Sequence, residues 1–214
     1  MSSARPSRQS VSVLGLAVAL AALGGAARAV PAHEPDDMAL GSPRAPVTVI
    51  EYASVGCPHC AAWNNQVFPT IRSQYIASGK ARLVVREMLT GDGPVAAAGF
   101  LLARCAGPAK YFPVIDAIYH RQDNMYQAGN TPDAVLRDIA KTVGGMNGAA
   151  YEACINDPQG QAAINARNVR HLNVDQIEET PTFFVNGGRL ADELAPGDLA
   201  KAVHGHARSA GHRR

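Results

Sequence analysis

The chain has 214 residues, of which 20 are Lys or Arg and 18 are Asp or Glu, so its formal net charge is +2. This near balance gives no basis for a nucleic-acid partner, which a strongly basic surface would indicate. Hydrophobic residues make up 47% of the chain, enough for a packed core. The length suits one domain with an insertion better than two independent domains.

Residues 1–29 have the pattern of a cleaved export signal. Arg5 and Arg8 form a basic start, residues 11–23 are an apolar run, and small residues end at Ala29, where a signal peptidase could cut. The apolar run is shorter than the roughly 20 residues that cross a bilayer, so a membrane anchor is the weaker interpretation. We therefore expect a periplasmic protein that is cut after Ala29. Loss of this leader, which has three arginines and no acid, changes the formal charge to −1.

A strand, helix, strand pattern follows the leader. The stretches "VTVIEYA" at 47–53 and "ARLVVREML" at 81–89 have the β-branched and aromatic composition of buried strands. Between them, a helical pattern starts at the tetrad "CPHC" and ends near Ser78. The links are short, so we expect a βαβ unit whose two strands are parallel.

The next part of the chain, from about residue 92 to 175, is rich in helix-forming residues and contains no credible strand. It predicts an inserted all-helical domain. Thr131 followed by Pro132 has the pattern of an N-cap and a first helical residue. The helices are expected at 94–105, 109–122 (with Pro113 in its first turn), 131–144, 147–157 and 158–172.

Strand character returns at 182–185 in "TFFV", and "NGG" after it is a strong turn signal. A short partner strand in "GRLADE" and a helix that begins near Pro196 complete the chain. The order βαβ, helical block, ββα is that of a thioredoxin fold with an insertion. We assign the thioredoxin-like domain to residues 30–91 and 176–214, an α/β fold interrupted by the helical domain.

The tetrad from Cys57 to Cys60 has three possible roles. A structural zinc site needs four ligands, and the other two cysteines, Cys105 and Cys154, are single and distant. A purely structural disulfide across so short a loop would remove little entropy from the unfolded chain. A redox-active pair in an exported chain is the best interpretation. We expect no metal and no cofactor beyond this disulfide.

The position of the tetrad between a strand and a helix assigns its residues. Cys57 lies at the helix N-terminus, where unpaired N–H groups and the helix dipole favour a thiolate, so we expect a lowered pKa and a nucleophilic role. Pro58 suits the first helical turn. Cys60 lies one turn later and would resolve a mixed disulfide. The His59 imidazole could donate to the Cys57 thiolate and favour an oxidising disulfide; alternatively it is an exposed loop histidine with no electronic role.

These motifs together resemble the DsbA family of thiol:disulfide oxidoreductases. The segment "EYASVGCPHC", the helical insertion and the block "TPTFFVNG" occur in the order typical of that family, over roughly residues 46–207. The resemblance implies a monomeric enzyme that donates its disulfide to newly exported proteins. It also implies that a quinone-linked membrane oxidase of the DsbB kind reoxidises the enzyme.

The resemblance adds three residues to the site. Thr180 and Pro181 fall where the family has a cis-proline loop that faces the disulfide and binds substrate backbone, although a trans proline at the start of a strand is the simpler alternative. Glu51 matches the buried acid beneath the active site, where burial would raise its pKa and let it exchange a proton with Cys60. A Glu51 that faces outward from an edge strand is the alternative.

Cys105 and Cys154 lie in the helical insertion, and some DsbA relatives from alphaproteobacteria have a second disulfide there. The resemblance therefore implies a structural Cys105–Cys154 bond, and two buried free thiols are the alternative. The lead hypothesis for the chain is an oxidase. Because Thr180 stands where the best-known oxidases have valine, a disulfide isomerase or reductase is the second hypothesis, and a non-catalytic chaperone for exported proteins is the third.

Overall fold

The computed structural model describes residues 34–211, with side chains up to residue 206. The export signal expected at residues 1–29 lies outside this range. Five strands form one mixed sheet in the order β1-β3-β2-β4-β5. They are β1 (Met38–Leu40), β2 (Val47–Ala53), β3 (Ala81–Glu87), β4 (Thr182–Val185) and β5 (Gly188–Arg189). Across residues 34–211, no helix is both long and apolar enough to span a membrane.

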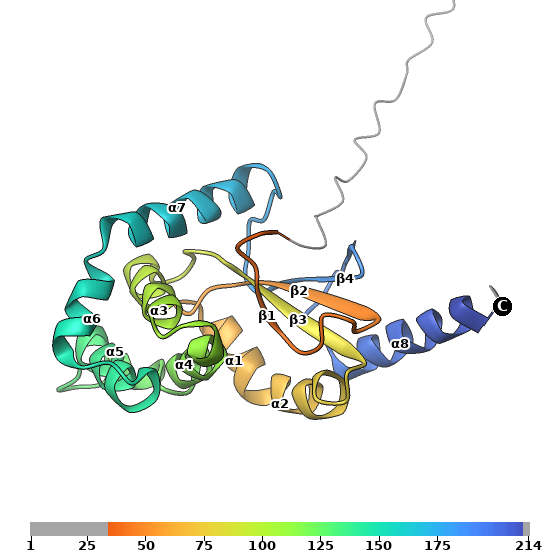
Figure 1. Ribbon diagram of the computed structural model, residues 1–214, viewed down its shortest axis with the longest axis horizontal. Coiled ribbons are helices and arrows are strands. Elements are labelled where there is room, and N and C mark those ends of the chain that lie inside the picture. Colours follow the sequence, from red (N-terminus) through yellow and green to blue (C-terminus); the bar gives the residue numbers. More distant parts are fainter. Residues whose placement is uncertain (1–33, 212–214) are drawn as a thin grey trace, which may run out of the picture.

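Helices surround this sheet, and most of them lie between β3 and β4. Figure 1 shows the helices of this insertion as a block beside the sheet. The helical segments are α1 (Pro58–Gln66), α2 (Phe68–Ile71), η1 (Arg72–Ile76), α3 (Gly93–Cys105), α4 (Pro108–His120), η2 (Asp123–Tyr126), α5 (Pro132–Ile139), η3 (Ala140–Gly144), α6 (Gly148–Ile155), α7 (Pro158–Asn173) and α8 (Pro196–Gly211).

The two strands expected at the start of the domain are confirmed. β2 spans the predicted residues, and β3 lies parallel to it with Val47 opposite Ala81. β1, which the sequence pattern does not indicate, pairs antiparallel with β3 at the edge of the sheet. β1 has only three residues and lies between prolines, with Pro35 before it and Pro43 after it, so neither its length nor its surroundings indicate a strand.

The centre of the sheet is β2, which has β3 on one side and β4 on the other. Side chains alternate between the two faces of a strand. Val49 and Ala53 lie in the larger hydrophobic core, and Ile50 and Tyr52 lie in a second, smaller core on the opposite face. Glu51 therefore shares the face of Val49 and Ala53. This face lies beneath α1, where the family resemblance places a buried acid.

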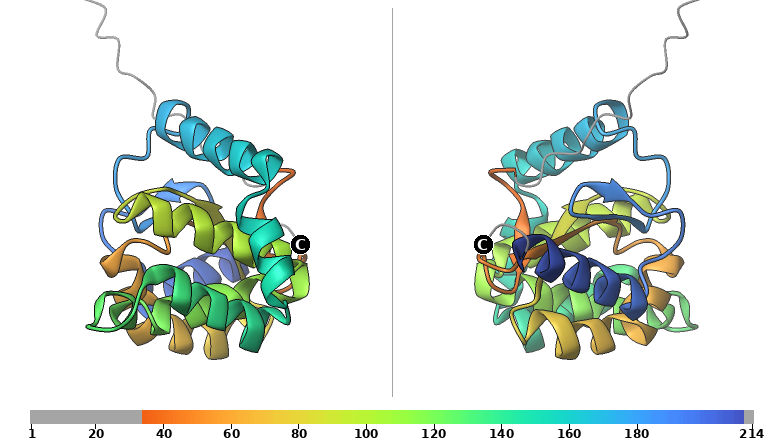
Figure 2. Two further views of the ribbon diagram at one scale, coloured as in Figure 1. Left: turned by 90° about the vertical axis from the view of Figure 1, so that its left-hand side faces the viewer. Right: turned by 90° about the vertical axis from the view of Figure 1, so that its right-hand side faces the viewer.

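Two layers of helix cover the sheet. Trp63 of α1 and Leu199 of α8 belong to the larger core, whereas α7 lies across the other face, where its His171 ring meets the Tyr52 ring edge-on at 5.1 Å. Figure 2 shows α7 and α8 on opposite sides of the sheet. β2 therefore has helices packed over both of its faces and a neighbouring strand at each edge.

The first helical run is interrupted where the sequence predicted one helix to about Ser78. α1 ends at Gln66, and two short segments, the second of π type, continue to Ile76. Pro69 accounts for the break, because it has no N–H to donate to the carbonyl four residues earlier. The break separates α1, which begins at the tetrad, from α2 and η1.

The inserted helices agree with the prediction except at Pro113. Thr131 caps α5 by accepting a hydrogen bond from the Ala134 N–H, as expected. α4 begins at Pro108, so Pro108 occupies the first turn and Pro113 lies inside the helix, which makes the predicted position of Pro113 wrong. The cause is that Gly107, with φ 87°, precedes Pro108 and starts the helix one residue earlier than the sequence pattern suggested.

A buried carboxylate fastens the inserted helices to the sheet. Glu87, at the end of β3, is 1% exposed. Its Oε1 accepts hydrogen bonds from Arg104 of α3 at 2.6 Å and from the Tyr111 hydroxyl of α4 at 3.0 Å, and its Oε2 accepts from Arg167 of α7 at 2.8 Å. A buried charge held by this many partners is costly to disrupt, so one residue fixes three helices relative to β3.

The turn after β4 has the predicted chemistry, but its partner strand is short. Asn186 and Gly187 have φ values of 49° and 84°, the left-handed conformation that these residue types tolerate. The expected partner "GRLADE" forms a strand only at Gly188–Arg189. The remaining residues of that stretch, through Glu193, form a loop beside the active site.

A disulfide joins Cys105 at the end of α3 to Cys154 of α6, the pair that the family resemblance implied. The Cα atoms are 6.2 Å apart and the two residues are separated by 49 positions in the sequence. Cys154 is buried against the larger core. The bond therefore closes a long loop within the inserted helices.

Replacement of both Cys105 and Cys154 by alanine is expected to lower the free energy of unfolding by about 2–4 kcal/mol, because the unfolded chain regains the entropy of an open loop. Denaturant unfolding measures this change, with Cys57 and Cys60 kept in the same redox state in both proteins. An unfolding midpoint equal to that of the unsubstituted protein would contradict a stabilising role.

Candidate active site

Cys57 lies where the chain leaves the central strand and enters α1. It is the N-cap residue of that helix, with extended φ and ψ of −100° and 122°, and Pro58 occupies the first helical position. No side chain caps the helix. The Cys57 sulfur therefore lies beside the first free N–H groups of α1, as the sequence predicted.

The surroundings of Cys57 favour its thiolate. Its pKa is lowered from 9.0 to about 5, chiefly by a hydrogen bond from the Cys60 thiol, with further hydrogen bonds from Thr180 and from the backbone N–H groups of Cys60 and His59. Burial opposes these effects, since Cys57 is only 7% exposed. The hydrogen bonds outweigh it, so Cys57 is the nucleophile of the pair.

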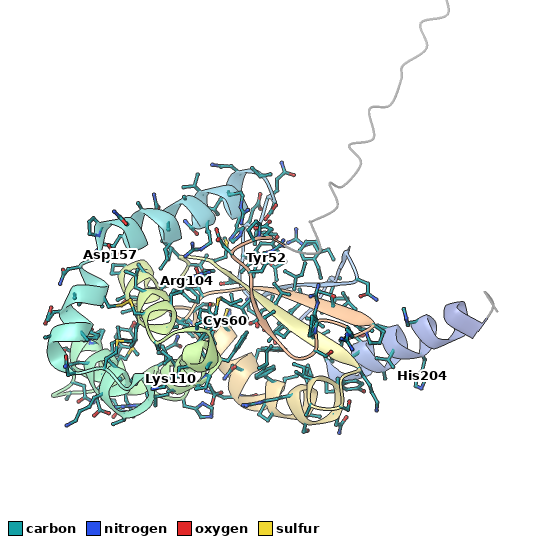
Figure 3. All side chains as sticks on the ribbon, in the orientation of Figure 1. Tyr52, Cys60, Arg104, Lys110, Asp157 and His204 are labelled. Carbon is teal, nitrogen blue, oxygen red and sulfur yellow. A yellow bond between two sulfur atoms is a disulfide. The ribbon has the colours of Figure 1, made fainter. Side chains whose placement is uncertain are left out.

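Cys60 has the opposite environment. Its side chain is fully buried, and the nearest backbone donor is the Ser54 N–H at 3.5 Å from the sulfur. Burial, together with the neighbouring Cys57 and Glu51, raises the pKa of the Cys60 thiol. Figure 3 places Cys60 in the interior, between the sheet and the inserted helices. Cys60 is therefore the protected member of the pair, and the two thiols are not joined in this structure.

His59 is exposed, and its imidazole does not make the expected hydrogen bond to Cys57; no side-chain hydrogen bond of His59 occurs within residues 34–206. Its contribution to the thiolate comes from its backbone N–H instead. The reason is positional: a residue in the first helical turn directs its N–H toward the N-cap and its side chain outward. The imidazole lines a surface groove beside the tetrad.

The Thr180–Pro181 peptide bond is cis, at the position that the family resemblance indicated. The loop lies directly against the nucleophile, since the Cys57 thiol donates a hydrogen bond to the Thr180 carbonyl at 3.3 Å. The Thr180 hydroxyl lies 2.5 Å from that of Thr90, in the loop after β3. The cis-proline loop therefore contacts both the Cys57 sulfur and the loop after β3.

Two glycines that the sequence analysis did not single out let the loop after β3 approach the active-site loop. A Cβ on Gly56 would lie 2.3 Å from the carbonyl oxygen of Asp92, and one on Gly91, at φ 69°, would lie 2.2 Å from that of Gly56. The Asp92 N–H donates to the Gly56 carbonyl at 3.1 Å. Only backbone without side chains permits this approach. The signal in the sequence is the glycine directly before the tetrad.

Glu51 is buried beneath the tetrad, as the family resemblance implied, and does not face outward. It is 3% exposed, and burial raises its pKa from 4.5 to about 8. It also raises the pKa of Cys60 by its charge. A carboxyl group that is largely protonated at neutral pH can give a proton to a departing Cys60 thiolate or take one from the thiol.

A small cavity of about 20 Å³ adjoins Glu51 and was not foreseen. Asn64, Asp116 and Tyr119 also line it. Oε1 of Glu51 and the hydroxyl of Tyr119 have no hydrogen-bond partner in the described part of the chain. Asn64 donates to Asp116 at 3.0 Å, and the Asp116 carboxylate is partly exposed. The polar groups beneath the tetrad therefore extend from the sheet to α4 of the insertion.

Trp63, on the second turn of α1, packs within the core. Its ring centroid lies 4.7 Å from that of Phe183 of β4. The indole Nε1 donates a hydrogen bond to the Leu194 carbonyl at 2.8 Å. The helix that carries both active cysteines is thus joined to the loop before α8.

One group of side chains, away from the tetrad, brings metal-ligand atoms together. Glu34, His171 and Asp175 offer atoms within 4.8 Å of one another. Glu34 already forms ion pairs with Arg86 and Arg170. Two guanidinium groups beside this carboxylate disfavour a cation there. This group acts as part of the ionic contacts between α7 and the sheet.

Comparison with known proteins identifies the fold that these features form. A family model described as thioredoxin matches residues 33–204. The chain belongs to the thioredoxin family. The match extends from β1 into α8 and contains every residue of the site described above.

Two relatives of this chain have names that refer to disulfide chemistry. One relative is a Rickettsia conorii protein that is named as a protein-disulfide oxidoreductase. It is 34% identical over 152 residues, which are 71% of this chain and 54% of that protein. Disulfide bond formation protein D of Bacillus subtilis is 26% identical over 149 residues, or 69% of this chain and 66% of that protein. This thioredoxin-family chain thus spans about half the length of the Rickettsia conorii relative.

Solved structures confirm the expected thioredoxin fold and its resemblance to DsbA proteins. Wolbachia pipientis alpha-DsbA1 superposes with a TM-score of 0.75 at 24% identity, over 85% of this chain and 96% of that one. BdbD of Bacillus subtilis superposes with a TM-score of 0.67 at 22% identity, over 80% of this chain and 93% of that one. At these identities the likeness is one of fold.

In the reduced protein, the Cys57 thiolate is expected to titrate at about pH 5, well below the ordinary value of 9.0, because four hydrogen bonds stabilise it. Ultraviolet absorbance of the thiolate measures the titration, and Cys57→Ser, which lacks the group, is the control. A step near pH 9 in the unsubstituted protein would remove the argument for Cys57 as nucleophile.

Glu51→Gln is expected to stabilise the oxidised protein at pH 8 by about 2–4 kcal/mol, because it removes a carboxyl group whose charged form is poorly solvated. The folded-state pKa of Glu51 is raised, so its protonated form is retained in the folded protein up to a higher pH than in the unfolded chain. The stability linked to this proton is therefore fully present below pH 4.5 and is lost as pH rises through about 8. Denaturant unfolding across this range should show the two stability curves diverging with rising pH. Curves that stay parallel would show that Glu51 has an ordinary pKa.

Proposed function

We propose that this chain is an exported thiol:disulfide oxidoreductase that donates the Cys57–Cys60 disulfide to folding proteins in the periplasm. The observation that carries the proposal is the opposite perturbation of two thiols in one tetrad: the pKa of Cys57 falls to about 5, and that of Cys60 rises. The oxidoreductase names of the relatives support the same class of reaction.

The lowered pKa of Cys57 sets the direction of electron flow. A stabilised thiolate lowers the free energy of the reduced protein and leaves its disulfide unaffected, so the disulfide becomes a better oxidant. A thiol of low pKa is also a good leaving group when a mixed disulfide is cleaved. Both effects favour oxidation of substrate dithiols over their reduction.

The proposed reaction has two exchanges. A substrate thiolate attacks the Cys57 sulfur, the substrate–Cys57 bond forms, the Cys57–Cys60 bond breaks, and Cys60 leaves as a thiolate that takes a proton from Glu51. A second substrate thiolate then attacks the substrate sulfur of the mixed disulfide, and Cys57 leaves as a thiolate. Two electrons pass from the substrate dithiol to the protein. The Thr180 backbone, beside Cys57, would hold the substrate as an added strand.

Export and reoxidation complete the proposal. The pattern of residues 1–29 supports export, and the Cys105–Cys154 disulfide is the kind of bond that persists in an oxidising compartment. The similarity to DsbA proteins supports reoxidation by a membrane partner of the DsbB kind and a monomeric enzyme. The fold itself does not require a second copy to complete the tetrad.

Thr180 favours a second candidate, a disulfide isomerase or reductase. Its hydroxyl is one of the groups that lower the pKa of Cys57, so it affects how fast Cys57 leaves a mixed disulfide. One solved structure of similar fold, at a TM-score of 0.65, bears the name protein-disulfide isomerase, from Novosphingobium aromaticivorans. An isomerase must break non-native disulfides of its substrate and let them form again. The lifetime of the mixed disulfide with Cys57 is therefore the property that distinguishes an isomerase from an oxidase.

The proposal predicts an oxidising active site. Equilibration in glutathione buffers should give a reduction potential nearer to about −120 mV, as for DsbA, than to about −270 mV, as for thioredoxin, because the Cys57 thiolate is stabilised. Quantification of both thiols by alkylation and mass measurement gives the ratio. A potential at the thioredoxin value would overturn the oxidase.

Two variants make this test specific. Cys60→Ala whose Cys57 has first been loaded as a mixed disulfide with 2-nitro-5-thiobenzoate should release that thiolate to a test protein with one free cysteine and retain the test protein on Cys57. Cys57→Ser, treated in the same way, should form no such adduct. A non-catalytic chaperone would keep its effect on folding in Cys57→Ser. An isomerase would rescue a test protein with scrambled disulfides faster than it oxidises a fully reduced one.

A further inference from the structure

A surface groove of about 440 Å³ lies beside the nucleophile. Thr180 and Pro181 form one wall, and His59 reaches it from the start of α1. The Thr180 carbonyl is 3.3 Å from the Cys57 sulfur. Any chain that pairs with the cis-proline loop while its cysteine meets Cys57 must therefore place its neighbouring residues in or over this groove.

The charged side chains of the groove are mostly acidic. Glu179, Asp192 and Glu193 line it, and Arg189 is the one arginine or lysine among its described lining residues. Arg189 approaches Glu179 at 3.9 Å, and both side chains are well exposed. Asp192 and Glu193 have no hydrogen bond or ion pair to any residue between 34 and 206. Two carboxylates are thus free to meet a charge from outside.

Apolar surface completes the groove. Pro181 and Leu190, both partly exposed, line it as well. An extended peptide alternates its side chains, so one row can lie on this apolar strip while the residues beside it reach the carboxylates. The groove therefore suits a segment that combines apolar residues with positive charge, and it disfavours an acidic one.

We propose that this groove selects substrate segments that carry lysine or arginine close to the reacting cysteine. The inference rests on the proposed disulfide-donating function and names the substrate class of that same site. Asp192 and Glu193 supply the attraction, and Arg189 moderates it by pairing with Glu179. The groove residues recognise charge and take no part in the exchange of electrons.

The expected selectivity is moderate because the groove is open to solvent. Charged groups at the rim of an interface act mainly on the association rate, so we expect about a threefold to tenfold advantage in kcat/KM for a basic peptide over a neutral one. The advantage should shrink as ionic strength rises, since salt screens exposed charges beyond about 10 Å at 0.1 M.

The test uses the oxidised protein and two dithiol peptides that differ only beside the cysteines, with lysines in one and glutamines in the other. Lysine also makes a nearby thiol more reactive by lowering its pKa. Each rate is therefore divided by the rate of the same peptide with 2-hydroxyethyl disulfide, which is uncharged. The remaining ratio between the peptides measures selection by the protein alone.

Three variants assign the effect to the groove. Asp192→Asn with Glu193→Gln should bring the normalised ratio close to one, and Arg189→Gln should increase it. The control, Asp138→Asn with Glu152→Gln, removes the same charge from exposed acids of the inserted helices and should leave the ratio unchanged. Asp138 and Glu152 line neither the groove nor the tetrad, so the rate with the neutral peptide should stay the same in the control variant.

The outcomes separate this inference from the proposed function. A ratio of one in the unsubstituted protein, with both peptides oxidised much faster than by 2-hydroxyethyl disulfide, overturns the charge selection and leaves the oxidoreductase intact. Failure to oxidise either peptide overturns the function, and with it the inference. A ratio that falls equally in the control variant would assign the preference to overall charge and overturn the role of the groove.

Discussion

The site depends on the way α1 begins directly at the carboxyl end of the central strand. Cys57 is at once the last residue of that approach and the N-cap of the helix, so its sulfur shares space with free N–H groups. The same geometry carries Cys60 inward by one turn, to a fully buried position above Glu51. One change of direction in the backbone therefore gives two chemically identical side chains opposite environments.

The backbone reaches this arrangement because neighbouring loops can approach it closely. Gly56 and Gly91 let the loop after β3 contact the active-site loop without side chains between them. From the third side, the cis Thr180–Pro181 bond places a carbonyl against the Cys57 sulfur. Farther away, Glu87 at the end of β3 binds side chains of α3, α4 and α7. These contacts hold in place the end of β3, where the loop that carries Gly91 begins.

Much of this could be predicted from the sequence, because the relevant signals are local. The composition of residues 47–53, the proline after Cys57 and the Thr131 cap each determine their own element. The pairing of Cys105 with Cys154 and the roles of Thr180 and Glu51 came from the family resemblance. Residue patterns alone do not show which distant segments meet.

The errors and omissions have a common physical cause. The three-residue strand β1 is stabilised by its pairing with β3 and has no pattern of its own. The start of α4 was misplaced because Gly107 and Pro108 together begin a helix before the apolar pattern does. The imidazole of His59 was expected at the thiolate, whereas its backbone N–H lies there. Tyr119 and the cavity beside Glu51 result from the packing of α4 on the sheet, which no local pattern records.

The hydrogen bond from Trp63 to the Leu194 carbonyl has a mechanical consequence. Leu194 directly follows Asp192 and Glu193, so the segment that lines the groove is held at one end by the helix that carries Cys57 and Cys60. The groove segment and the two cysteines are therefore attached to the same helix. Loss of the Trp63 indole would release the groove segment from α1 and also remove the ring that packs against Phe183.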